Sequence, residues 1–342
     1  YMKCVAIEGA KQLVVKEIAE PVSENGSVVV DVKKAGICGS DIHYWESGQP
    51  VGLVMGHEYC GVVTDPGARE DLKVGDRVTA LPISPCGHCS ACLTGNPQYC
   101  RETWTYATGL SLTNSGAFAP KLSVRSDMVF KVPDNVTDEE MAMVEPTAVG
   151  LHAIHLADIK VGAKVLVVGG GIIGLVSAMF AKKEGASYVA VSETNRARGE
   201  KSVQLGVADE WLDATDEKFL EKVLAKTGEG FDLVIDCSGN SAAVTSCFMS
   251  AKPGGTVVLV GVSLTPITIP TVVAVMSELT VKGAIAYTKE EFHTCIELIA
   301  NKQIDVSKFV SKVVGLNQVQ ASFEELTSGQ SDSIKILVDP NR

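Results

Sequence analysis

The sequence predicts an α/β protein in which a doubly wound parallel sheet is inserted into a second, β-rich domain. Between residues 163 and 198, a buried strand, a glycine turn, an amphipathic helix and a second strand follow one another. Three further apolar strands follow at 231–239, 253–262 and 279–287, with helical segments between them. Since 342 residues suffice for two domains, we expect residues 1–147 and 289–342 to form one domain and residues 148–288 the other.

The composition is that of a globular protein, with 46% apolar and 21% charged residues. A formal charge of −11 argues against nucleic acid or an anionic membrane as a partner. Three prolines and three glycines interrupt the longest uncharged run, 253–277, so we expect it to form buried strands and an interface rather than a membrane span. No signal-peptide pattern opens the sequence, which favours a cytoplasmic location.

The glycine turn satisfies G-x-G-x-x-G with Gly169, Gly171 and Gly174. Such a turn, continued by Ile172 and Ile173, brings the backbone close to a pyrophosphate at a helix N-terminus. Methyltransferases share a related unit, but the succession of strands favours a dinucleotide.

Glu193 ends the second strand, where a carboxylate accepts hydrogen bonds from the adenosine ribose and repels a 2′-phosphate. NAD is therefore expected rather than NADP, although Arg196 and Arg198 follow closely and could soften that preference.

Four of the ten cysteines stand close together, at C-x2-C-x2-C-x7-C. They are Cys86, Cys89, Cys92 and Cys100, the ligands expected for one zinc ion. Four thiolates leave no open coordination position, so the lobe at 86–100 is predicted to be structural. Free cysteines, a redox pair or a nucleic-acid-binding zinc ribbon are the alternatives, and the acidic charge disfavours the last.

A second metal site is predicted from Cys38, His57 and Glu145, a mixed set that leaves zinc an open position. Glu58 is a further or alternative ligand. A capping box at 137–140 is expected to start a helix. Pro146 is expected to break that helix directly after Glu145, so that the carboxylate points away from it.

Several motifs together resemble those of the zinc-dependent medium-chain alcohol dehydrogenases. They are GHEYCG (56–61), GDRV (75–78), the four-cysteine lobe and VVGGGIIG (167–174). Within that superfamily, CGSDIHYW (38–45) and EPTAVGLHA (145–153) resemble the polyol (sorbitol and xylitol) dehydrogenases. VAVSE (189–193), DCSG (236–239) and GAIAYTKEEF (283–292) resemble the 2,3-butanediol dehydrogenases. The resemblance implies a GroES-like catalytic domain, a Rossmann domain that binds NAD, catalytic and structural zinc, and a homodimer or homotetramer.

The resemblance also implies residue roles. Cys38 and His57 would bind the catalytic zinc, with Glu58 and Glu145 as carboxylates that exchange with water. Ser40 would bind the alcohol and pass its proton through the cofactor ribose to His43. The remaining implied contacts are Glu193 and Arg198 at the adenosine ribose, Val260, Gly261 and Val262 at the nicotinamide, and Tyr44 and Tyr287 at the substrate.

The implied reaction oxidises a secondary alcohol, a vicinal diol or a polyol to the ketone. Ala286 stands where the polyol dehydrogenases carry an arginine, which favours a small diol over a long polyol. The loop between Gly48 and His57 is shorter than in these enzymes, which removes part of one wall of the substrate site. A zinc-free NADP-dependent reductase of the same superfamily and a non-catalytic NAD-binding protein are the alternatives.

Overall fold

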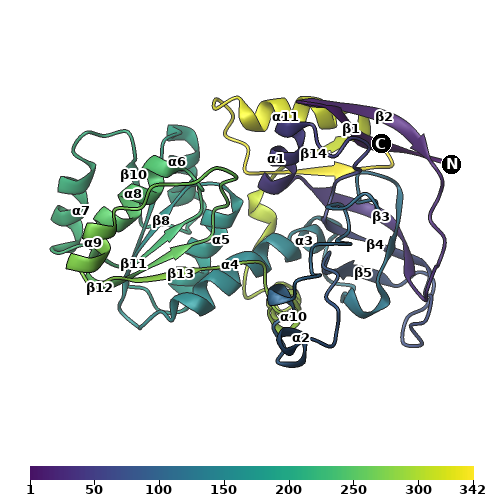
Figure 1. Cartoon of the computed structure of the whole chain (residues 1–342), viewed down its shortest axis with the longest axis horizontal. Coiled ribbons are helices and arrows are strands. Elements are labelled where there is room, and N and C mark those ends of the chain that lie inside the picture. The colour runs from purple at the N-terminus through teal and green to yellow at the C-terminus, as the bar shows by residue number, and fades with distance from the viewer. The chain divides into compact units, whose positions relative to one another are not determined.

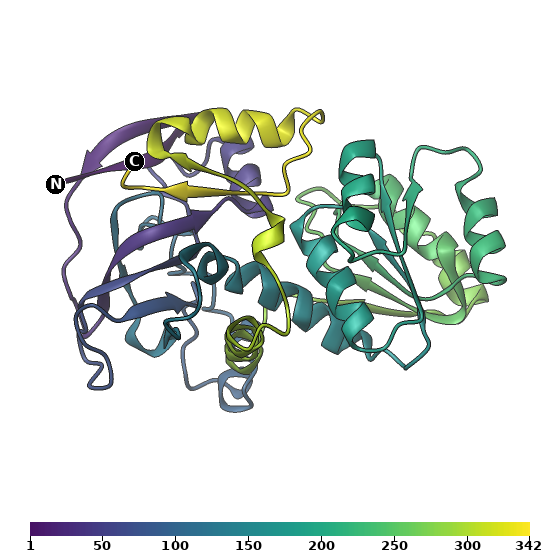
Figure 2. The same ribbon diagram turned by 180° about the vertical axis from the view of Figure 1, so that it is seen from behind.

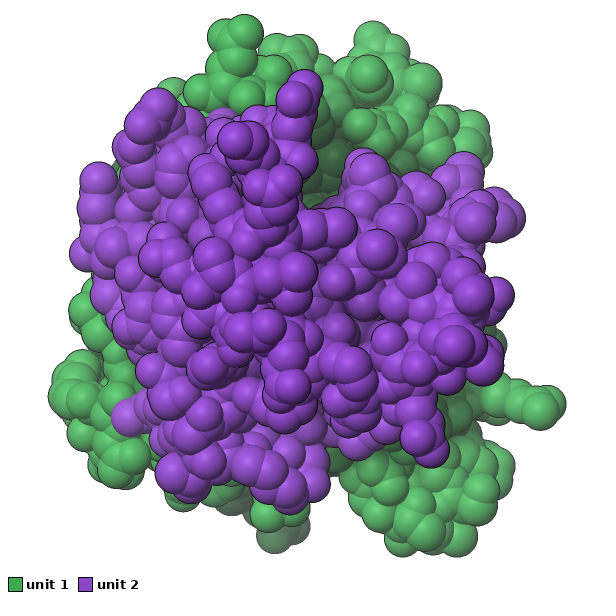
Figure 3. Space-filling view, turned by 90° about the vertical axis from the view of Figure 1, so that its left-hand side faces the viewer, with its two compact units in different colours: residues 1–145, 287–342 green, residues 146–286 purple.

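The computed structural model describes all 342 residues. They form two compact units, each described below by itself: unit 1 is residues 1–145 with 287–342, and unit 2 is residues 146–286 (Figure 3). Unit 2 is thus one continuous segment inserted into the chain of unit 1. Together with the sheets described next, this confirms the predicted fold class.

Unit 2 is built on a six-stranded sheet in which every neighbouring pair is parallel, in the order β10-β9-β8-β11-β12-β13 (Figure 1). The strands are β8 (Lys164–Val168), β9 (Tyr188–Glu193), β10 (Glu210–Asp213), β11 (Phe231–Asp236), β12 (Ala251–Leu259) and β13 (Thr280–Gly283). Helices cover both faces (Figures 1 and 2). They are α4 (Val144–Ala157), α5 (Ile172–Lys183), α6 (Arg196–Gln204), α7 (Phe219–Thr227), α8 (Ser241–Ser250) and α9 (Thr271–Met276).

Strands covered on both faces require apolar side chains throughout. In β8 the last four residues, Val165 to Val168, are all buried, and the core around them includes Phe231 and Phe248. The order of the strands reverses between β8 and β11, which makes the carboxyl ends of these strands the expected place for a ligand.

The run 253–277 differs in part from its prediction. Its first part is strand β12, but residues 271–276 form helix α9, whose Val272, Val275 and Met276 are exposed. Pro270 precedes the helix as its N-cap, and a proline at a helix start sacrifices no intrahelical hydrogen bond. The expectation of buried strand is therefore wrong here. No helix of the protein is both long and apolar enough to cross a membrane.

Unit 1 contains a seven-stranded, largely antiparallel sheet, in the order β14-β15-β3-β4-β5-β7, with β6 paired to β3. Its strands are β3 (Val28–Gly36), β4 (Glu58–Asp65), β5 (Arg77–Ala80), β6 (Lys121–Val124), β7 (Val129–Lys131), β14 (Val310–Gly315) and β15 (Lys335–Asp339). A separate hairpin joins β1 (Met2–Gly9) to β2 (Gln12–Ile18). Because β15 pairs with β3 and β3 with β4, the last strand of the chain lies one strand away from β4, with Leu337 and Glu58 on opposite sides of Gly36.

Unit 1 contains five α-helices. They are α1 (Gly39–Ser47), α2 (Ser90–Leu93), α3 (Asp138–Ala142), α10 (Lys289–Ala300) and α11 (Val319–Thr327). Single 3-10 turns lie at Pro97–Tyr99, Ser126–Met128, Ser307–Phe309 and Leu316–Gln318.

The predicted capping box at Thr137 and Glu140 is present and starts α3, but the predicted break after Glu145 is wrong. The break between helices falls at Met143, and Pro146 lies in the first turn of α4. The first N–H groups of a helix have no intrahelical acceptor, so a proline is tolerated there. Glu145 is consequently a first-turn residue of α4 rather than a helix end.

Candidate functional site

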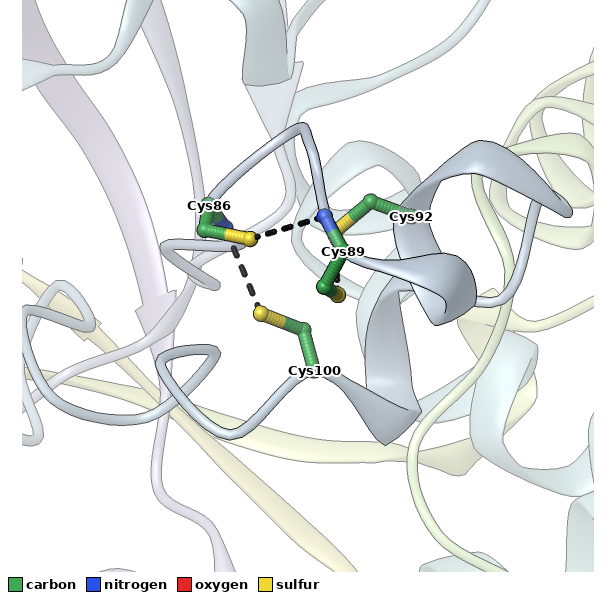
Figure 4. A group of neighbouring side chains, drawn as sticks. All are labelled: Cys86, Cys89, Cys92 and Cys100. Carbon is green, nitrogen blue, oxygen red and sulfur yellow. Dashed lines mark hydrogen bonds between the residues drawn. The ribbon is translucent and has the colours of Figure 1, made fainter.

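The four cysteines of the lobe converge in unit 1, with their sulfur atoms within 4.8 Å of one another (Figure 4). Cys89 is the N-cap of helix α2, and Cys100 directly follows the 3-10 turn at Pro97–Tyr99. None of the four forms a disulfide.

Backbone N–H groups point at these sulfurs. Those of Cys86 and Glu102 donate to Cys100 Sγ at 3.3 and 3.4 Å, and that of Gly87 donates to Cys92 Sγ at 3.3 Å. The donors to Cys100 lower the pKa of its thiol to about 6. Burial instead raises the pKa of the Cys92 thiol to about 12, so thiolate is not favoured throughout the loop. The convergence of four sulfurs fits a closed zinc site.

A second cluster of possible ligands lies elsewhere in unit 1. One donor atom each from Cys38, His57 and Glu58 lies within 4.8 Å of the other two. Cys38 is the N-cap of α1, while His57 and Glu58 lead into β4. Gly36 stands opposite Glu58 in the neighbouring strand, where a Cβ atom would come within 2.3 Å of Glu58 Oε2, so only glycine leaves room for this carboxylate.

Asp41 is a residue of this site that the sequence reasoning missed. Its fully buried carboxylate accepts the backbone N–H of Cys38 at 2.9 Å through Oδ2, and Oδ1 lies 3.4 Å from His57 Nδ1. One side chain therefore orients both the cysteine and the histidine. An acidic residue three positions after the N-cap was the signal that could have found it.

Glu145, the other expected ligand, lies outside the group of three. Its Oε1 accepts a hydrogen bond from the Tyr287 hydroxyl at 2.6 Å. Burial raises the pKa of Glu145 to about 7 and, with the Glu145 carboxylate, raises that of Tyr287 well above its ordinary value. Tyr287, expected at the substrate, thus has its hydroxyl bound to a protein carboxylate.

Lys335 in β15 was also missed. Its fully buried ammonium donates to Glu58 Oε2 at 2.6 Å and to the carbonyl of Ile37 at 2.8 Å. A lysine within the apolar stretch 334–338 was the only hint in the sequence.

The second cluster fits a metal ion on two observations. Glu58 Oε1 is buried without a hydrogen-bond partner in the protein. Burial, and then the Glu58 carboxylate, raise the pKa of the Cys38 thiol, so a cation is needed to hold it as thiolate. Sulfur, imidazole nitrogen and carboxylate oxygen together are a zinc donor set.

Helix α1 carries three further predicted residues. The Ser40 hydroxyl donates to Cys38 Sγ at 3.4 Å, which places it at the cluster. His43 and Tyr44 lie further along the helix, and both are partly exposed. His43 comes three positions after Ser40, so the two share one face of the helix.

In unit 2 the glycine turn has the predicted conformation. Gly169 ends β8 with φ of 107°, and Gly171 is the N-cap of α5, with no side chain to cap its N–H groups. Ile172 and Ile173 open the helix. A Cβ atom on Gly174 would lie 1.9 Å from the carbonyl oxygen of Gly169, so helix and turn can pack only with glycine here. The free N–H groups leave a site for an anion.

Glu193 ends β9 directly beside this turn. Its carboxylate accepts the backbone N–H groups of Gly170 at 2.8 Å and Asn195 at 2.9 Å, and it lies 3.5 Å from Arg198 Nη2. The hydrogen bond from Gly170 therefore holds the Glu193 carboxylate against the glycine turn.

Residues 260–262, expected at the nicotinamide, follow β12. The N–H groups of Val260 and Gly261 donate to the carbonyl of Asp236 at 2.9 and 3.0 Å, and Val262 is exposed. Asp236, which the sequence reasoning missed, also accepts N–H groups from Ser238 and Gly239 through its carboxylate. It thereby joins the loops after β11 and β12 at the carboxyl edge of the sheet.

Comparison with known proteins agrees with this geometry. Residues 24–134 match the family model of the alcohol dehydrogenase GroES-like domain, and residues 173–301 that of the zinc-binding dehydrogenases. The sorbitol dehydrogenase of Bacillus subtilis is 29% identical, over 100% of this chain and 98% of its own. The L-threonine 3-dehydrogenase of Pseudoalteromonas translucida is 32% identical, over 92% of this chain and 93% of its own.

Among solved structures, 2R,3R-butanediol dehydrogenase from Bacillus subtilis superposes with a TM-score of 0.88 at 30% identity and covers 100% of both chains. The resemblance stated from the sequence motifs is thereby confirmed, together with the zinc and nicotinamide chemistry that the family carries. The chain belongs to the zinc-binding dehydrogenases of the medium-chain alcohol dehydrogenase superfamily.

Proposed function

We propose that this dehydrogenase oxidises a secondary alcohol, within a vicinal diol or a polyol, to the ketone with NAD as hydride acceptor. The observation that carries the proposal is the buried group of Cys38, His57 and Glu58 donors. Three protein ligands leave zinc one position for a substrate oxygen, which a structural site does not. A zinc-free reductase would have no use for this group.

Zinc bound by this group supplies a Lewis acid that lowers the pKa of an alcohol oxygen, and nicotinamide supplies the hydride acceptor. The Ser40 hydroxyl at Cys38 would accept the alcohol proton and pass its own proton through the cofactor ribose towards His43. His43, on the same face of α1 and partly exposed, is placed to release a proton to water. The free N–H groups at the start of α5 bind the diphosphate of the cofactor.

NAD rather than NADP is supported by Glu193. Two backbone N–H groups hold its carboxylate beside the glycine turn. There it would accept hydrogen bonds from the ribose hydroxyls of the cofactor and repel a phosphate at the 2′ position. Arg198 Nη2 lies 3.5 Å from the same carboxylate. Glu193 therefore offsets part of the positive charge with which Arg198 could bind a 2′-phosphate.

A small diol is supported by Ala286. Its buried methyl group directly precedes Tyr287. The polyol dehydrogenases that this sequence resembles carry an arginine at this position. Without a cationic side chain, the hydroxyls of a long polyol have one hydrogen-bonding partner fewer.

Steady-state assays of 2,3-butanediol, sorbitol, xylitol and L-threonine, each with NAD and with NADP, test the proposal by the absorbance of reduced nicotinamide. We expect the highest kcat/KM with the diol and NAD. Activity that survives complete removal of zinc by a chelator would favour a zinc-free reductase, and no turnover with any alcohol would favour a non-catalytic protein.

The proposed assembly is a homodimer or homotetramer. Strand β13 is the outer strand of its sheet, and the segment 264–276 includes the exposed apolar side chains of Leu264, Val272, Val275 and Met276. Exposed apolar surface is typical of an interface. Light scattering should give at least twice the chain mass, and a monomer would contradict the proposal.

A further inference from the structure

The two carboxylates near the catalytic metal cluster have different partners. Glu58 is bound by the ammonium of Lys335, and Glu145 by the hydroxyl of Tyr287, each at 2.6 Å. All four side chains are buried in unit 1, and both partners belong to the part of the chain that follows residue 286.

The two contacts leave the carboxylates unequally available. Of the two Glu58 oxygens, Lys335 contacts only Oε2, so Oε1 remains buried without a partner. Glu58 belongs to the group of possible metal ligands. Glu145 is bound through Oε1 and lies outside that group. The short hydrogen bond from the Tyr287 hydroxyl to Oε1 opposes any movement of Glu145 towards the metal.

The backbone reinforces the position of Tyr287. Ala286, directly before it, has φ of 50°, in the left-handed region that a non-glycine residue adopts only at a cost in energy. Lys335 is likewise fixed at a second point, by the carbonyl of Ile37.

We propose that Tyr287 and Lys335 are positioning residues that decide which carboxylate the metal takes. Tyr287 retains Glu145, and Lys335 presents the free oxygen of Glu58. The proposal rests on the metal site of the proposed function and names the residues that control exchange at it.

The test uses holoenzyme in which cobalt replaces zinc, because the visible absorption of Co²⁺ reports the number and kind of its ligands. We expect Tyr287→Phe to change this spectrum and to alter the rate of metal release to a chelator about tenfold. If Glu145 causes the change, then Glu145→Gln and the double variant Tyr287→Phe/Glu145→Gln should have the same spectrum. Lys335→Met is an independent test of the second contact. It should also change the cobalt spectrum, and this change should be absent when Glu58 is substituted as well.

Tyr188→Phe is the matched control, since it removes another tyrosine–glutamate hydrogen bond, to Glu210 at 2.5 Å, in unit 2. It should leave the spectrum unchanged. If Tyr287→Phe and Lys335→Met, both folded by circular dichroism, have the wild-type spectrum and release rate, the inference is wrong while the proposed function stands. A wild-type protein that binds metal only in the four-cysteine lobe would instead remove the proposed function.

Discussion

The Asp41 carboxylate lies 3.4 Å from His57 Nδ1 and, through its other oxygen, accepts the backbone N–H of Cys38 at 2.9 Å. One buried side chain thus orients the cysteine at the start of α1 and the histidine at the start of β4. In metal sites, such an outer carboxylate fixes the ring and increases its strength as a ligand.

Asp41→Asn should therefore weaken zinc binding at this cluster by about 10- to 100-fold. Competition with a chromophoric chelator measures the affinity, and zinc in the four-cysteine lobe should be unaffected. Asp76→Asn is a suitable control, because Asp76 is another buried carboxylate of unit 1 that accepts a backbone N–H, from Lys73 at 3.0 Å. Equal zinc affinity in both variants would refute the role given to Asp41.

The glycine turn allows stability and cofactor binding to be separated. A Cβ atom on Gly171 would meet nothing within 4 Å, and the φ of −76° suits alanine. Gly171→Ala should thus fold with at least wild-type stability, yet raise the KM for the dinucleotide, because the methyl group covers backbone that the diphosphate approaches.

Gly174→Ala is the counterpart. Its Cβ atom would lie 1.9 Å from the Gly169 carbonyl oxygen, so unfolding should require about 1–3 kcal/mol less free energy. Thermal denaturation and cofactor titration of both variants test the pair. A Gly171→Ala variant with unchanged cofactor affinity would show that the diphosphate binds elsewhere.

Cofactor choice should depend on Glu193. Glu193→Ser removes the acceptor for the N–H groups of Gly170 and Asn195, together with the charge that would face the 2′ position of the proposed cofactor. The ratio of kcat/KM for NAD to that for NADP should fall by about tenfold or more, equivalent to about 1.4 kcal/mol. Glu200→Ser, on the exposed side of α6, should leave the ratio unchanged. An unchanged ratio in Glu193→Ser would mean that this carboxylate does not select the cofactor.

Asp232 gives a pH dependence with a definite sign. Partial burial raises the pKa of this carboxyl, but the N–H of Lys164 at 2.7 Å and the ammonium of Lys252 outweigh burial and hold the pKa below its usual value. A lowered pKa in the folded state contributes stability above the unfolded-state value of about 3.9, and this contribution is lost as the pH falls through the folded-state pKa.

Asp232→Asn keeps the acceptor for Lys164 but lacks the charge. The melting temperature should therefore be lower than that of the wild type at pH 7 and pH 5, and the difference should shrink as the pH approaches 3. Glu217→Gln controls for the loss of a negative charge on the surface of unit 2. A difference that is the same at every pH would contradict the ion-pair account.

Local patterns predicted much of this molecule. The spacing of Cys86 to Cys100 and of Gly169 to Gly174 lies within single loops, so the sequence alone indicates that these residues meet. The partners of the two glutamates could not be found in this way. Lys335 is 277 positions from Glu58, and Tyr287 is 142 from Glu145. The first contact exists only because β15 pairs with β3 and β3 with β4.

The two errors in secondary structure both involve proline. Pro146 was expected to end a helix and instead lies in the first turn of one, where it disrupts no hydrogen bond. The valine-rich segment after Pro270 was expected to be strand and forms helix α9. Whether a proline ends or begins a helix depends on how the chain packs on both sides of it, which its identity alone does not reveal.

The central claim is that the chain holds two zinc ions, one of them bound by Cys38 and His57 at the catalytic cluster. Zinc per chain, measured by plasma mass spectrometry on wild type, Cys38→Ser and Cys92→Ser, tests it most directly. We predict two equivalents in the wild type and one in each variant, with activity abolished in Cys38→Ser. One equivalent in the wild type, retained in Cys38→Ser and lost in Cys92→Ser, would contradict the account.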